Sequence, residues 1–166
     1  MTYRYFAYGS TLDAGHLADW CREHGIEGFA LAEGQPAVLD DFELALTVPS
    51  RYWMGAVGTL EPRPGAAVYG VLFELADADA DTVRHKEGVA TGLFRELDVE
   101  VRLWGPGGDD PGTVQLRSAS AFRAAEGRAV AEPPPPSRRW LEIVARGAGA
   151  WGLPRVWIDK LGAGKP

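Results

Sequence analysis

The chain has 166 residues, of which 46% are hydrophobic and 24% are charged, as is typical of a folded, water-soluble protein. Its formal net charge of -6 argues against nucleic acid or an anionic membrane as a partner. The single cysteine, Cys21, excludes an internal disulfide and a cysteine-rich metal site. No stretch has the length and apolarity of a membrane span, and the first ten residues do not resemble a signal peptide. We therefore expect a cytoplasmic protein folded as one domain over residues 1–166.

The N-terminal stretch YFAYGSTL, residues 5–12, predicts a strand that turns abruptly into a helix. Its aromatic residues favour a strand, and Gly9 permits a tight turn. Ser10, Thr11 and Asp13 are all suitable N-caps for the helix that follows. Such a turn presents backbone N–H groups that suit a carboxylate or a developing oxyanion. Its ordinary interpretation is a first strand, a tight turn and a capped helix.

The remaining elements follow from periodicity and from turn residues. Helices are predicted at residues 13–24, 76–88 and 154–161, and a further helix is expected after an N-cap at Ser137. Turns are predicted around residues 34–36, 49–51 and 61–65, and a hairpin loop at residues 105–112. Strands are predicted at residues 29–32, 37–47, 55–60, 68–75, 93–104 and 113–122.

Helices inserted among hairpin-like strands predict an α+β fold. We expect a single domain built on a mixed, closed or nearly closed β-barrel with flanking helices. The tail, residues 162–166, is expected to be flexible.

Few residues carry a signal for chemistry. The three histidines are not spaced like metal ligands, and surface or helix-flanking positions are their expected role. Cys21 lies on the apolar side of its predicted helix and is expected to be a small buried hydrophobic residue. Glu87 differs, because it ends a helix directly before Gly88. A carboxylate at such a junction can project into a cavity, where burial would raise its pKa and make it a general base. The alternative is an exposed glutamate before a helix-ending glycine.

Taken together, the motifs resemble the γ-glutamylcyclotransferase family. YFAYGSTL is similar to the family's YFAYGSNL-type signature, and WMGAVGTLEPRPGAAVYGVLFEL, residues 53–75, resembles two central strands and the turn between them. KEGVATGLF, residues 86–94, is similar to the segment that holds the family's catalytic glutamate. The run from residue 135 to residue 161 resembles the family's C-terminal Pro-Ser, helix, Gly-Leu-Pro and helix. The order and spacing match over nearly the whole chain.

This resemblance implies an enzyme that cyclises a γ-glutamyl amide. The α-amine attacks the γ-carbonyl of the same group, and 5-oxoproline and a free amine or amino acid are released. The resemblance assigns Glu87 as the general acid and base, and the backbone from Tyr8 through Gly9 and Ser10 to Thr11 as the cradle for the glutamyl group or its oxyanion. It implies no metal, no organic cofactor and a possible homodimer.

The sequence departs from the family pattern at three positions in the predicted site. Thr11 stands where asparagine is usual, and Phe94 and Trp140 stand where tyrosines are common. If Phe94 and Trp140 line the pocket, it should be drier and shaped for a different leaving group, such as an amine or a γ-glutamyl-protected intermediate of a biosynthetic pathway.

Two other functions are compatible with the same residues. One is a non-catalytic module that binds a small molecule in the retained pocket. The other is an amidohydrolase or amine-lyase in which Glu87 activates water or a different amine. The products separate these alternatives, because hydrolysis gives glutamate whereas cyclisation gives 5-oxoproline.

Overall fold

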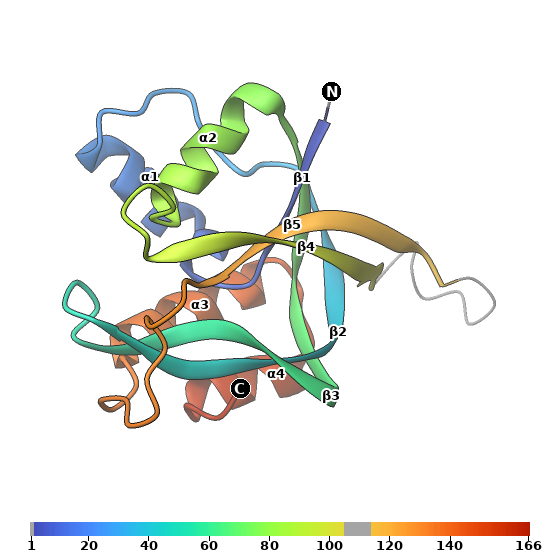
Figure 1. Ribbon diagram of the computed structural model, residues 1–166. Helices are drawn as coiled ribbons and strands as arrows, with labels where there is room; N and C mark the ends of the chain where they lie inside the picture. Colours follow the sequence, from blue (N-terminus) through green and yellow to red (C-terminus); the bar gives the residue numbers. More distant parts are fainter. Residues whose placement is uncertain (1, 105–113) are drawn as a thin grey trace.

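A computed structural model describes residues 2–104 and 114–166 and shows a β-barrel with helices packed around it (Figure 1). The predicted loop at residues 105–112 lies outside the described residues. The elements in chain order are β1 Thr2–Ala7, the 3-10 turn η1 Ser10–Leu12, α1 Ala14–Glu23, β2 Gly34–Ser50, β3 Gly55–Ala76, α2 Asp77–Lys86, β4 Phe94–Leu103, β5 Leu116–Ala124, α3 Arg138–Ala150 and α4 Arg155–Gly162.

The sheet closes on itself in the order β1-β3-β2-β4-β5. Strand β1 completes the circle by pairing in parallel with β5 at Tyr5 and Ser120, whereas all other neighbours are antiparallel. Closure leaves the barrel no open edge and gives it an interior that side chains fill. The predicted α+β class with a closed mixed barrel is confirmed.

The long hairpin of β2 and β3 corrects one prediction. The turn expected at residues 61–65 is instead an irregularity within β3, where Asp40 pairs with Ala67 but Phe42 pairs with Pro62. Positive φ angles at Asp41 (61°) and Gly65 (82°) accommodate the extra residues, and the Gly65 amide donates to Asp41 Oδ1 at 2.9 Å. Proline and glycine here mark a bulge rather than a chain reversal.

Other boundaries were predicted with mixed success. Residues 29–32 form no strand, and residues 34–36, predicted as a turn, begin β2. Asp13 caps α1 by accepting from the His16 amide at 2.7 Å, and Ser137 caps α3 by accepting from the Trp140 amide at 3.1 Å, which confirms both helix starts. Cys21 is buried, as expected.

An ion pair joins α3 to the start of α1. Arg146 of α3 donates to both carboxylate oxygens of Asp13, at 2.6 and 3.0 Å, and thereby holds the two elements together.

In Figure 1, α3 and α4 lie below the pair formed by α1 and α2. None of the helices in the described residues has the length and apolarity to cross a membrane. After α4, the Lys165 amide donates to the Lys160 carbonyl at 2.9 Å; flexibility of the tail stays a prediction.

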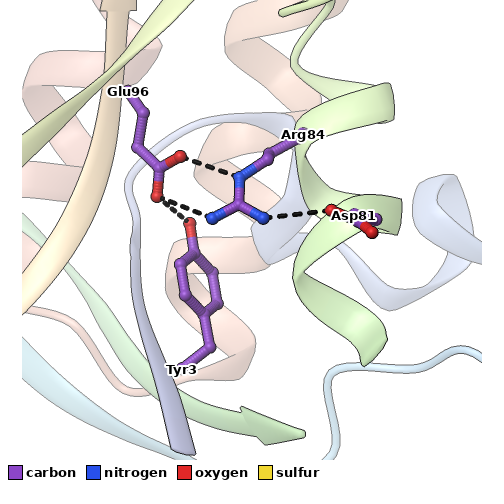
Figure 2. Close-up of polar contacts among 4 residues, drawn as sticks. All are labelled: Tyr3, Asp81, Arg84 and Glu96. Carbon is purple, nitrogen blue, oxygen red and sulfur yellow. Dashed lines mark hydrogen bonds and ion pairs between the residues drawn. The ribbon is translucent and has the colours of Figure 1, made fainter. Parts of the chain in front are cut away.

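A second cluster fastens α2 to the barrel (Figure 2). Glu96 of β4 accepts hydrogen bonds from the Tyr3 hydroxyl at 2.8 Å and from Arg84 of α2 at 2.8 and 3.3 Å. Arg84 also donates to Asp81 at 3.0 Å. Burial alone would raise the pKa of Glu96, but these donors and the Arg84 charge outweigh burial and lower it. The cluster fixes the position of α2 and therefore that of Glu87, the residue directly after it.

Candidate functional site

A cavity of about 430 Å³ lies where the turn after β1, α1, the β2–β3 turn and the end of α2 converge. A cavity of this size accommodates a small organic molecule. All predicted site residues except Thr11 line it. The residues in its wall are Tyr5, Tyr8, Gly9, Ser10, His16, Trp20, His24, Val48, Pro49, Ser50, Arg51, Tyr52, Trp53, Val57, Gly58, Lys86, Glu87, Leu93, Phe94, Phe122 and Trp140.

Glu87 is the C-cap residue of α2, and the backbone around it is fixed by a Schellman motif. The Gly88 amide donates to His85 at 3.0 Å, and the Val89 amide donates to Arg84 at 3.1 Å. Gly88 has φ +70°, a left-handed conformation that a side chain would strain. The glycine therefore ends the helix directly after Glu87 and holds that residue at the cavity wall.

The Glu87 carboxylate receives a hydrogen bond from the Tyr5 hydroxyl at 2.8 Å. Burial raises its pKa, while the nearby Lys86 ammonium and the Tyr5 hydrogen bond partly offset that rise. Burial and the Glu87 charge also raise the pKa of Tyr5, so the phenol keeps its proton and stays a donor. Glu87 is thus a more basic carboxylate than an exposed glutamate.

Thr11 lies behind this pair, outside the cavity wall. Its side chain is buried, and its hydroxyl lies 3.0 Å from the Tyr5 hydroxyl. The Thr11 side chain is therefore linked to the cavity through Tyr5, whereas the role expected for the Thr11 backbone in the cradle stays a prediction.

The turn after β1 forms the next part of the wall. The Leu12 amide donates to Gly9 at 3.1 Å and the Asp13 amide to Ser10 at 3.2 Å, which closes the 3-10 turn. The first amides of such a turn have no acceptor within it. Tyr8 is anchored by its hydroxyl, which donates to the Phe122 carbonyl. Gly9 and Ser10 are thereby presented to the cavity.

Phe94 and Trp140 provide an apolar portion of the wall, and both are buried. Trp140 packs against β3 so closely that a Cβ at Gly58 would lie 2.7 Å from its ring. Only glycine fits at position 58 without displacing the indole. Neither ring carries the phenolic hydroxyl that a tyrosine would bring to these positions.

Several wall residues were missed by the sequence analysis. Tyr5 was considered only as a strand former, and Lys86 was not considered at all. His16 was expected near the surface, but it is buried, and burial together with Lys86 and Arg139 lowers its pKa to about 4. His16 and Trp20 of α1 and its C-cap residue His24 are spaced four residues apart, a helical pattern that could have identified a shared surface.

The cavity thus combines one carboxylate of raised basicity, a phenol donor, a helical-turn backbone and apolar rings. These groups can accept a proton from a bound molecule and return it. Among residues 2–104 and 114–166, no group of three histidine, cysteine or acidic side chains is arranged to hold a metal ion.

Comparison with known proteins places this geometry in context. The chain is 28% identical over 167 residues to a human protein named gamma-glutamylcyclotransferase, covering 99% of this chain and 80% of that protein. It superimposes on a structure named gamma-glutamyl cyclotransferase with a TM-score of 0.74 at 23% identity, covering 98% of this chain and 88% of the other. A yeast gamma-glutamyl cyclotransferase specific to glutathione gives a TM-score of 0.65 at 14% identity, with 98% and 94% covered.

A family model described as the AIG2-like family matches residues 67–161, which is more than half of the chain and includes Glu87, Phe94 and Trp140. The chain belongs to the AIG2-like family.

Proposed function

We propose that this protein is a γ-glutamyl cyclotransferase that releases 5-oxoproline and a free amine or amino acid from a γ-glutamyl amide. The observation that carries the proposal is the Glu87 carboxylate, held at the cavity wall by the Schellman motif and hydrogen-bonded to Tyr5 at 2.8 Å. The name shared by its curated relatives supports the same reaction.

In the proposed reaction, the Glu87 carboxylate takes a proton from the substrate's α-ammonium, because only the free amine is a nucleophile. The amine nitrogen forms a bond to the γ-carbonyl carbon, and the carbonyl π electrons move to its oxygen. The tetrahedral intermediate collapses, the original amide C–N bond breaks, and protonated Glu87 returns its proton to the leaving nitrogen. The Glu87 carboxylate then removes the second proton from the ring nitrogen and passes it to the released amine, which departs as an ammonium ion. No water is consumed and Glu87 is regenerated.

The surroundings of Glu87 suit both proton transfers. Burial makes the carboxylate a stronger base, while Lys86 and Tyr5 limit the rise in its pKa so that the ionised form stays accessible. The backbone from Tyr8 to Thr11 is proposed to cradle the glutamyl group or its oxyanion. The apolar Phe94 and Trp140 are proposed to contact the substrate and shape the site for its leaving group.

The deciding experiment is a product assay on wild type and Glu87→Gln with a panel of γ-glutamyl amino acids and γ-glutamyl amines. We expect wild type to release 5-oxoproline and Glu87→Gln to do so about 10²- to 10⁴-fold more slowly. Glutamate in place of 5-oxoproline would replace the proposal with an amidohydrolase. Binding without any turnover would favour a small-molecule-binding module.

A further inference from the structure

Lys86 faces the cavity, and no carboxylate in the described part of the chain forms a hydrogen bond or salt bridge with it. Its Nζ lies 3.4 Å from Ser10 Oγ and 3.5 Å from His16 Nε2, and it lies 5.7 Å from the centre of the Trp20 ring. Its neighbour Glu87 is hydrogen-bonded to Tyr5 instead. Within residues 2–104 and 114–166, Lys86 forms no salt bridge, although other cations of the chain do.

Lys86 forms two long hydrogen bonds, which leave one of its three donors unused. An ammonium carries three N–H donors and cannot accept, so it donates to the Ser10 hydroxyl and to an unprotonated His16 Nε2. Both contacts are near the outer limit of hydrogen-bond distance, and both acceptors are neutral. His16 stays neutral near pH 7 because its pKa is lowered to about 4.

The charges around the cavity contrast with those of the whole chain. The protein carries a net charge of -6, yet the charged wall residues are Arg51, Lys86 and Glu87. Arg139 is exposed and does not line the cavity, but its guanidinium lies 5.1 Å from the centre of the Trp53 ring and adds a third cation nearby. The site therefore favours a ligand that carries a negative charge.

We propose that Lys86 and Ser10 form a subsite that binds a carboxylate of the γ-glutamyl substrate, and that Lys86 thereby determines which substrates are accepted. A carboxylate would supply the short, charge-assisted contact that Lys86 lacks within the protein. This inference rests on the proposed function for its substrate class.

A γ-glutamyl amino acid has two carboxylates that fit this subsite. The glutamyl α-carboxylate shares its carbon with the α-amine, and Lys86 directly precedes Glu87, so binding there would bring the amine to its base. The other is the carboxylate of the leaving amino acid. If Lys86 binds the glutamyl α-carboxylate, it is needed for every substrate. If it binds the carboxylate of the leaving amino acid, it selects against substrates whose leaving group is a simple amine.

To distinguish the two carboxylates, Lys86→Gln is assayed with γ-glutamyl-L-phenylalanine and with γ-glutamylphenethylamine, which lacks only the leaving-group carboxylate. We expect KM to rise about tenfold or more, for both substrates if the α-carboxylate is bound and for the amino acid alone if the leaving carboxylate is bound. Lys86→Arg should restore part of the loss. The matched control is the exposed Lys165→Gln, which changes the net charge equally. Unchanged KM for both substrates would overturn the proposal.

A binding measurement keeps this test independent of turnover. Calorimetry would compare γ-glutamyl-L-phenylalanine binding to Glu87→Gln and to the double variant Glu87→Gln/Lys86→Gln, each first shown by circular dichroism to be folded. We expect about tenfold weaker binding to the double variant. Lys86-dependent binding without wild-type turnover would keep the subsite and reject the cyclotransferase. Turnover with equal binding by both variants would keep the cyclotransferase and reject the subsite.

Discussion

Two polar clusters at α2 differ in how completely their charges are paired. On one face of the helix, Arg84 is paired with both Glu96 and Asp81, and Tyr3 donates to Glu96 as well (Figure 2). At the helix end, the hydrogen bonds of Lys86 within residues 2–104 and 114–166 are long and go to neutral groups, and Glu87 accepts from the Tyr5 phenol. In the first cluster the charged groups pair with one another, and the cluster holds the helix in place. The second keeps unused donors and acceptors beside a cavity, which is what a binding site requires.

A matched pair of glutamate substitutions tests this contrast with the largest expected effects. Glu96→Gln should lower the free energy of unfolding by about 1–2 kcal/mol, at the low end for a charged hydrogen-bond acceptor because its cluster is partly exposed. Its turnover should persist while the protein stays folded. Glu87→Gln should lose turnover by about 10²- to 10⁴-fold without loss of stability. Urea unfolding and the 5-oxoproline assay measure both quantities.

The contrast would fail if the two variants exchanged effects. Destabilisation by Glu87→Gln would show that this carboxylate holds the fold together. Full stability of Glu96→Gln would show that the Arg84 cluster does not fasten α2.

The pH dependence of stability should have opposite signs in the two clusters. The folded-state pKa of Glu96 is lowered, so its contribution is present above the ordinary glutamate pKa and is lost as pH falls through the folded value. The folded-state pKa of Glu87 is raised, so its ionisation costs stability as pH rises through that value.

Urea unfolding from pH 3 to 8 would measure both dependences. The deficit of Glu96→Gln should shrink toward acid pH, and a gain in stability of Glu87→Gln should appear only toward neutral pH. Parallel curves for wild type and both variants would contradict these assignments.

Sequence was sufficient for the elements whose signals are local. The caps Asp13 and Ser137, and the helix-ending Gly88, act through neighbouring amides and were predictable for that reason. Residues 61–65 were misread because proline and glycine mark both turns and bulges. Only the pairing of β2 with β3 on both sides of that segment distinguishes the two.

The site was predictable in part from the family resemblance. The resemblance pointed to Glu87 and to the turn after β1, and the structure brings these to one cavity. Tyr5 was missed because an aromatic residue is already expected in a strand, so nothing in the pattern indicated a second role. Its contact with Glu87 spans 82 positions of sequence. The departure at Thr11 could not be interpreted from sequence, since only the structure shows it behind Tyr5.

Tyr5→Phe sharpens the comparison by removing the hydrogen bond that the Tyr5 hydroxyl donates to Glu87. Without it, the pKa of Glu87 should rise further, because the Tyr5 hydrogen bond lowers it. Turnover near neutral pH should fall roughly tenfold, and the acid limb of its pH profile should move upward. The matched control is Tyr3→Phe, which removes the corresponding donor to Glu96. An unchanged pH profile for Tyr5→Phe would show that the phenol does not tune the base.

Thr11→Val should have the smallest effect, because Thr11 acts on Glu87 only through Tyr5. Valine preserves the shape of the buried threonine but removes its hydroxyl, so Tyr5 keeps its bond to Glu87 and loses a restraint on its orientation. We expect a loss of turnover of about two- to fivefold, near the energy of one neutral hydrogen bond. Combining Thr11→Val with Tyr5→Phe should cost little more than Tyr5→Phe alone, since both substitutions act on one chain of contacts. Additive losses in the double variant would instead mean that the Thr11 hydroxyl affects turnover by a route that does not pass through Tyr5.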